Sequence, residues 1–159
     1  MLTACTHFSP SEYKIIRRAI NILSSALREE PELCATSPET SIDYIRLQFY
    51  SRHEREHFLV LFLDNQNKLI TSEFLFSGTI NHVEVHPRVI AQQALKYNAQ
   101  ALILAHNHPS DSLSPSPADI RITEQIRQAM TLLEIRILDH FIVPATGADY
   151  YSFAQHGQL

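Results

Sequence analysis

Two histidines, a serine and an aspartate lie within fourteen residues near the middle of the chain and could together build a metal site. His106 and His108 are separated by one residue, and Ser116 and Asp119 follow in the pattern H-x-H-x7-S-x2-D. Neutral imidazoles and a carboxylate are typical ligands of a catalytic zinc ion, and three protein ligands leave a fourth position open for water. The pattern therefore predicts a zinc-dependent hydrolase with His106, His108 and Asp119 as metal ligands.

The serine and the aspartate also fit a purely structural interpretation. The run Ser116-Pro117-Ala118-Asp119 is a helix-capping pattern, with a serine cap, a proline at the first helical position and an acid at the third. The chain repeats this pattern at Ser9-Pro10-Ser11-Glu12, where no chemistry is attached to it. The histidine pair favours the metal site, because two imidazoles on a buried strand are costly to leave without partners.

The elements expected around the motif bring these groups together. The apolar run from Ala101 to Ala105 predicts a short buried strand that ends at the histidines. Residues i and i+2 of a strand face the same side, so the two imidazoles point together and Asn107 faces the other side or the loop. A helix predicted from Pro117 to about Leu133 carries Asp119 in its first turn, from which the carboxylate can return to the histidine pair.

A zinc hydrolase also needs a carboxylate that is close to the water without binding the metal. Glu56 lies at the entry to the apolar run Phe58 to Leu63, and Glu73 lies in the strand that follows it. Either can be an exposed charge, because Glu56 ends a charged stretch and Glu73 lies on an alternating strand. Spacing alone leaves both candidates open.

The remaining pattern predicts an α/β fold. Helices are expected over residues 10–27, 38–49 and 87–95, and strands over 58–63, 69–76, 135–143 and 150–153. The first two strands form a hairpin around a turn at residues 64–67. Strands and helices alternate after residue 57, which indicates the α/β class. We expect an N-terminal helical segment at residues 1–36 and one domain at residues 37–159.

Composition narrows the class of protein. Apolar residues make up 45% of the chain and charged residues 19%, and the net charge of -4 argues against a broad nucleic-acid surface. The small basic cluster of Lys14, Arg17 and Arg18 is explained by a solvated helix face. The two cysteines, Cys5 and Cys34, form no disulfide framework, which favours a reducing compartment. With no apolar run of ~18 residues and no signal-peptide pattern, we expect a cytoplasmic protein without a membrane span.

The motif and the residues around it resemble a known family. H-x-H-x7-S-x2-D resembles the JAMM motif of JAB/MPN metalloproteases, and a longer stretch, about residues 40 to 155, resembles the RadC-like branch of that superfamily. The matching segments, in order, are Glu56-His57-Phe58, Leu63-Asp64, Asn67, Gly78-Thr79, His86-Pro87-Arg88, Ala105 to Ser110, Ser116, Asp119 and Leu138-Asp139-His140. The resemblance implies a three-layer α/β domain, with a mixed sheet flanked by helices, a zinc site at the sheet edge and one or two preceding N-terminal helices.

The resemblance also implies roles for individual residues. His106, His108 and Asp119 would bind zinc. The family's general acid/base is a glutamate at the start of a strand ahead of the H-x-H, a position that matches Glu56, and Ser116 would stabilise the oxyanion of a tetrahedral intermediate. The implied activity is that of a zinc metallopeptidase that cleaves a peptide or isopeptide bond. The sequence does not identify the peptide or protein substrate.

Two departures from the family pattern bear on this interpretation. The RadC-like pattern reads His-Asn-His-Pro-Ser-Gly, whereas this chain has Asp111 at the glycine position, which adds a charge beside the metal loop. Longer members carry a helix-hairpin-helix-like region for which residues 1–40 are too short, and this weakens a DNA-related role.

Two alternatives to the peptidase remain open. A non-catalytic or regulatory MPN-type module usually lacks the metal ligands that this chain has. A DNA-associated RadC-like protein would show basic residues with aromatic residues between them, a pattern that is missing here. The pair Asp139-His140 could orient a metal ligand without binding the metal itself. We favour a structural role for the pair, because the three ligands already complete the metal site.

Overall fold

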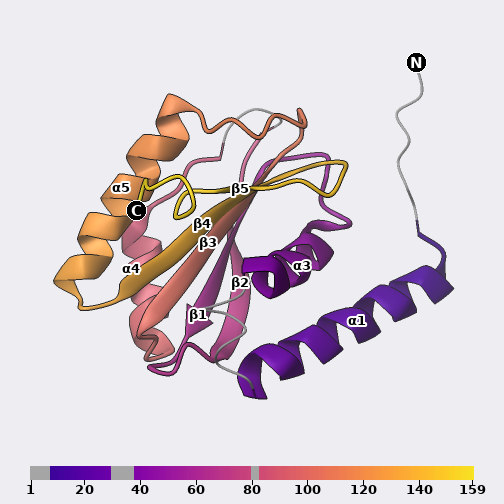
Figure 1. The fold of residues 1–159 in the computed structure, drawn as a ribbon, viewed down its shortest axis with the longest axis horizontal. Helices are drawn as coiled ribbons and strands as arrows, with labels where there is room; N and C mark the ends of the chain where they lie inside the picture. Colours follow the sequence, from indigo (N-terminus) through magenta and orange to yellow (C-terminus); the bar gives the residue numbers. More distant parts are fainter. Residues whose placement is uncertain (1–7, 30–37, 80–82) are drawn as a thin grey trace.

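The computed structural model describes residues 8–29, 38–79 and 83–159. In chain order its elements are α1 (Pro10–Glu29), α3 (Pro38–Phe49), β1 (His57–Leu63), β2 (Leu69–Ser77), α4 (Pro87–Lys96), β3 (Ala101–His108), α5 (Pro117–Leu132), β4 (Arg136–Pro144) and β5 (Tyr151–Ser152). The strands form one sheet in the order β2-β1-β3-β4-β5 (Figure 1), in which β3 and β4 are parallel and the other neighbours are antiparallel. The α/β fold with a mixed sheet is as predicted.

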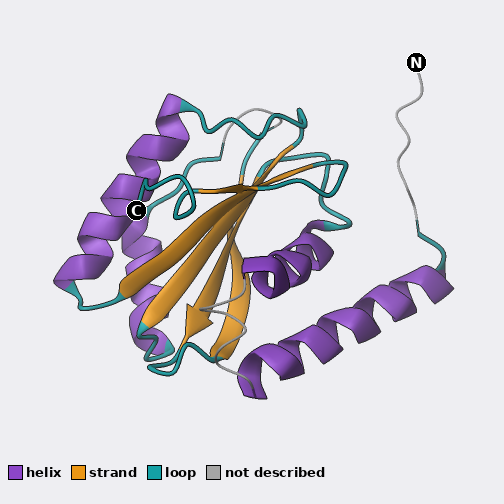
Figure 2. Ribbon diagram, viewed as in Figure 1, coloured by secondary structure: helices purple, strands orange, loops and turns teal. Residues whose placement is uncertain are grey.

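Helices cover both faces of the sheet, with α1 and α3 on one side and α4 and α5 on the other (Figure 2). β1 shows how the sequence produces these three layers. Its odd-numbered residues Leu59 and Leu61 pack in the cluster that contains α3. Its even-numbered residues Val60 and Phe62 pack in the cluster that contains α4 and α5. Because successive side chains of a strand face opposite sides, a strand buried on both faces is apolar throughout.

Helix α1 packs against the core through one stripe of apolar residues. Leu27 is fully buried in the cluster formed with α3 and the sheet, and Ile20 and Leu23 pack against the same cluster. The opposite side of α1 carries Ile15 and Ile22, which are 69% and 60% exposed. None of the helices in the described ranges combines the length and apolar character needed to cross a membrane.

β3 is longer than predicted, and the difference places both histidines inside the sheet. It runs to His108 because it pairs with β1 up to the Phe58–His106 pair and with β4 up to the His108–Pro144 pair. The even-numbered residues of β3 face α4 and α5, so the two imidazoles point toward α5. Asn107 faces the opposite side of the sheet.

Replacing Leu27 with alanine tests how firmly α1 belongs to the core. Leu27→Ala should lower the free energy of unfolding by about 2–5 kcal/mol, because it empties a fully buried position. Ile22→Ala, on the exposed side of the same helix, should change it by less than about 0.5 kcal/mol. Urea unfolding followed by circular dichroism measures both, and equal effects would contradict the packing described here.

Candidate metal centre

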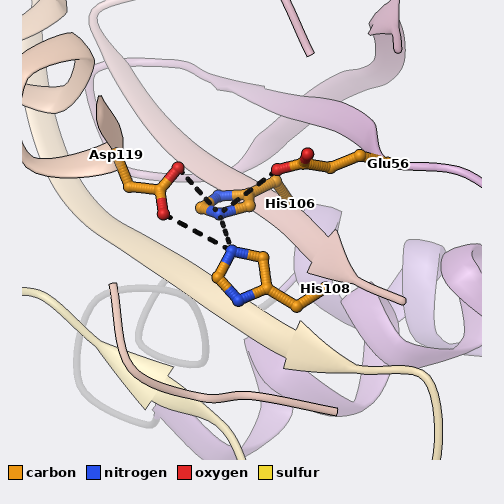
Figure 3. Close-up of side chains that lie close together, drawn as sticks. All are labelled: Glu56, His106, His108 and Asp119. Atoms are coloured by element: carbon orange, nitrogen blue, oxygen red, sulfur yellow. Dashed lines mark hydrogen bonds and ion pairs between the residues drawn. The ribbon is translucent and has the colours of Figure 1, made fainter. Parts of the chain in front are cut away.

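Four side chains that can ligate a metal converge at the end of β3 (Figure 3). His106 and His108 end this strand, Glu56 immediately precedes β1, and Asp119 lies in the first turn of α5. One ligand atom from each residue lies within 4.8 Å of those of the others. The group is therefore compact enough to hold a metal ion.

The three residues predicted as ligands lie closer to one another than to the glutamate. His106 Nε2 is 3.0 Å from His108 Nε2 and 3.4 Å from Asp119 Oδ1, and His108 Nε2 is 3.4 Å from Asp119 Oδ2. Glu56 Oε1 is 4.0 Å from His106 Nε2. Two histidines and one carboxylate thus form a tight triangle, with a second carboxylate set slightly apart.

Asp119 is held in place by the helix cap that the sequence predicted. The main-chain N and Oγ of Ser116 each donate to Asp119 Oδ2 at 2.7 Å, and Asp119 N donates to Ser116 Oγ at 3.1 Å. Burial opposes ionisation of Asp119, but its contacts with His106, His108 and Ser116 outweigh burial and hold the pKa of the carboxyl well below its usual value. Asp119 is therefore a carboxylate, the form that binds a metal.

His108 is oriented by a main-chain carbonyl. Its Nδ1 lies 2.6 Å from the carbonyl oxygen of Ser112. A carbonyl oxygen accepts but cannot donate, so Nδ1 carries the hydrogen and Nε2 of the neutral ring carries the lone pair. His108 therefore presents an Nε2 that can bind a metal to the centre of the cluster.

The structure brings Glu56 to the cluster and places Glu73 elsewhere. β1 and β3 are antiparallel with Phe58 opposite His106, so residue 56 falls level with the second histidine. Glu73 lies farther along the sheet and accepts a hydrogen bond from the hydroxyl of Tyr97. The choice that spacing left open follows from strand register.

Asn107 holds the segment that carries Glu56, a role that the sequence did not reveal. Its Oδ1 accepts from His57 N at 2.7 Å, and its Nδ2 donates to the carbonyl oxygens of Arg52 at 3.0 Å and Arg55 at 2.9 Å. These contacts lie on both sides of Glu56, and the Asn107 side chain is fully buried. The amide can make all three hydrogen bonds because it both donates and accepts.

His140 also contacts the centre, which fits the role that the sequence analysis considered but did not favour. Its ring is fully buried and bonded to His106 on one side and to Thr123, a residue that sequence reasoning missed, on the other. Burial lowers the pKa of His140 well below its ordinary value, so the ring is neutral. Asp139 does have a structural role, because its carboxylate accepts hydrogen bonds from Ser152 Oγ and from the main chain of the C-terminal segment.

A cavity of about 580 Å³ opens onto the cluster. One part of its lining is apolar and another consists of serines from the loop before α5, among them Ser116. None of the described residues that line it is a lysine or an arginine. The apolar lining residues are Phe58, Val83, Val85, Pro109, Ala118 and Ile122.

Asp111 adopts the backbone conformation that a glycine at this position would favour. Its φ is 59°, in the left-handed region. The carboxylate accepts hydrogen bonds from Thr146 N at 2.8 Å and Thr146 Oγ1 at 3.1 Å. The charge expected beside the metal loop thus ties this loop to the connection between β4 and β5.

Several known proteins are similar in sequence to this chain. A family model described as RadC-like JAB domain matches residues 35–158. UPF0758 protein YkfG of Escherichia coli (strain K12) is 47% identical over 151 residues, covering 95% of this chain and 93% of the relative. UPF0758 protein YeeS of the same organism is 47% identical over 151 residues, covering 95% of this chain and 99% of the relative. UPF0758 protein YfjY of the same organism is 45% identical over 146 residues, covering 92% of this chain and 89% of the relative.

Replacing Asn107 tests its hold on the glutamate segment. Asn107→Ala should lower the free energy of unfolding by about 2–4 kcal/mol, because buried main-chain groups lose their partners. The amide hydrogen of His57 should also exchange faster with solvent. Chemical denaturation and hydrogen exchange measure the two effects, with Asn65→Ala in the exposed β1–β2 turn as control. Unchanged exchange at His57 would contradict the role given to Asn107.

Proposed function

The chain belongs to the RadC-like JAB domain family, and we propose that it is a zinc-dependent hydrolase of the JAMM type that cleaves a peptide or isopeptide bond. The observation that carries the proposal is the convergence of His106, His108, Asp119 and Glu56 in one cluster beside a cavity, with His106 and Glu56 buried and the other two half-buried. Three of these residues would bind the metal and the fourth would move protons.

The spacing of the donor atoms supports zinc. Zinc lies ~2.0–2.2 Å from nitrogen and oxygen ligands, so neighbouring ligands on a tetrahedron are about 3.3 Å apart. His106 Nε2 and His108 Nε2 are 3.0 Å apart, and each lies 3.4 Å from an oxygen of Asp119, His106 from Oδ1 and His108 from Oδ2. Two imidazoles also favour zinc over magnesium or calcium, which prefer oxygen ligands.

The remaining side chains supply the proton transfers. When bound, zinc polarises a carbonyl group and lowers the pKa of a coordinated water toward ~7. Glu56 Oε1, 4.0 Å from His106 Nε2, would take the proton from the attacking water and deliver it to the leaving amine. Ser116 would support the oxyanion by exchanging its hydrogen bond to Asp119 Oδ2 for one to the substrate oxygen.

The cavity supports a peptide substrate over a nucleic acid. Its described lining contains two carboxylates of the cluster, Glu84, several serines and an apolar wall, with no lysine or arginine to bind phosphate. A peptide supplies the amide groups and apolar side chains that such a lining can bind. The intact ligand set also favours an active enzyme over a non-catalytic module. We further propose the cytoplasm as its location, because the two cysteines favour a reducing compartment.

Metal analysis tests the zinc site directly. The purified protein is incubated with zinc and the excess is removed. It should then retain one zinc ion per chain, as measured by elemental mass spectrometry. His106→Ala should retain none, because one of three ligands is lost. Glu73→Gln, which changes a carboxylate outside the cluster, should retain the wild-type amount. A wild-type protein that holds no zinc would contradict the proposed metal.

Replacing Glu56 separates catalysis from metal binding. Glu56→Gln should keep zinc but lower the rate of hydrolysis by about 10²–10⁴-fold, because the amide cannot accept the proton. The assay uses a peptide library that contains both main-chain and lysine ε-amide bonds, with cleavage read by mass spectrometry. Glu73→Gln serves as the control with wild-type activity. Full activity of Glu56→Gln would exclude Glu56 as the base.

A further inference from the structure

Behind the metal centre, a line of hydrogen bonds connects the main chain of Asp119 to the ring of His106. Thr123 Oγ1 lies 2.6 Å from the carbonyl oxygen of Asp119 and 2.6 Å from His140 Nδ1. His140 Nε2 lies 2.8 Å from His106 Nδ1. The side-chain members of this line are at most 2% exposed, so their hydrogen bonds are shielded from solvent.

The donor and acceptor properties of these groups determine the direction of every hydrogen bond in the line. The carbonyl oxygen of Asp119 can only accept, so it takes the single hydroxyl hydrogen of Thr123. Thr123 Oγ1 must then accept from His140, which places the hydrogen of the neutral His140 ring on Nδ1. His140 Nε2 is left as an acceptor and takes a hydrogen from Nδ1 of His106.

The opposite direction is less favourable. If the Thr123 hydroxyl donated to His140, its oxygen would face the carbonyl oxygen of Asp119 at 2.6 Å with no hydrogen between them. The hydrogen of His106 would then lie on Nε2, the atom that faces the other ligands. That nitrogen could not bind a metal.

We propose that Thr123 and His140 are positioning residues that keep the hydrogen of His106 on Nδ1 and so hold its Nε2 ready for the metal. The proposal rests on the zinc site proposed above. His108, at the end of β3, obtains the same effect from the loop carbonyl of Ser112. His106 lies within the sheet, where the main chain of β3 is paired with β1 and β4, and depends on side chains instead.

Zinc affinity, measured by competition with a chelator, tests the two residues. His140→Phe keeps an aromatic ring but removes the acceptor for His106, and should weaken zinc binding by about 10- to 100-fold. Thr123→Val removes the hydroxyl at nearly constant volume and should weaken binding by about 10-fold. Thr123→Ser should restore wild-type affinity.

A matched control is available on the same helix. Thr131 Oγ1 donates to the carbonyl oxygen of Arg127 at 2.8 Å, the same kind of bond that Thr123 makes. Within the described part of the chain, no hydrogen bond joins Thr131 to a histidine. Thr131→Val should leave zinc affinity unchanged. A loss as large as that of Thr123→Val would assign the effect to the helix and overturn the proposal.

Nitrogen-15 NMR of the histidine rings in the metal-free protein tests the direction itself. In the wild type the His106 hydrogen should lie on Nδ1, and Thr123→Val should shift part of the population to Nε2. A wild-type hydrogen on Nε2, or a Thr123→Val variant with unchanged tautomer and zinc affinity, would overturn the proposal. If the wild-type protein binds no zinc, the zinc site proposed above is contradicted. The position of the His106 hydrogen, measured by NMR, still tests the role of Thr123 and His140. If His140→Phe does not fold, the Thr123 variants decide it.

Discussion

The position of β3 between β1 and β4 is the constraint on which the rest of the centre depends. Antiparallel pairing with β1 sets Phe58 opposite His106, and this register brings Glu56 level with the histidines. Parallel pairing with β4 sets His140 opposite Leu104, two residues before His106, on the face that α5 covers. A shift of one residue in either pairing would turn a required side chain to the wrong face of the sheet.

Burial increases the electrostatic repulsion between the electron-rich atoms of this cluster. Nε2 of His106 and Nε2 of His108 lie 3.0 Å apart beside the carboxylate of Asp119. In the hydrogen-bond direction proposed above, both nitrogens of the neutral rings present lone pairs. Electron-rich atoms this close repel one another in a medium of low dielectric constant unless a proton or a metal ion lies between them. No lysine or arginine is among the described residues that line the cavity. A bound cation would turn the same arrangement from a cost into a favourable interaction.

Local patterns in the sequence were sufficient for the elements but not for all of the site. The apolar run of β1, the capping patterns and the histidine spacing each depend on neighbours in the chain. The helices, the hairpin and the convergence of His106, His108 and Asp119 could therefore be predicted. The choice between Glu56 and Glu73 depends on the register between β1 and β3, which short-range patterns do not encode. The sequence did not predict the role of Thr123, because this role depends on how α5 is rotated against the sheet.

The capping pattern at Ser116 and the metal ligand at Asp119 prove to be compatible rather than competing interpretations. The cap at Ser9 and Glu12 makes the same set of hydrogen bonds on the exposed surface, with both Ser9 N and Oγ donating to Glu12 Oε2. At Asp119 the cap likewise uses Oδ2, while Oδ1 faces His106. A carboxylate has about four lone-pair sites, so a capping bond leaves capacity for a metal. The cap thus fixes the orientation of the carboxylate that we propose as a metal ligand.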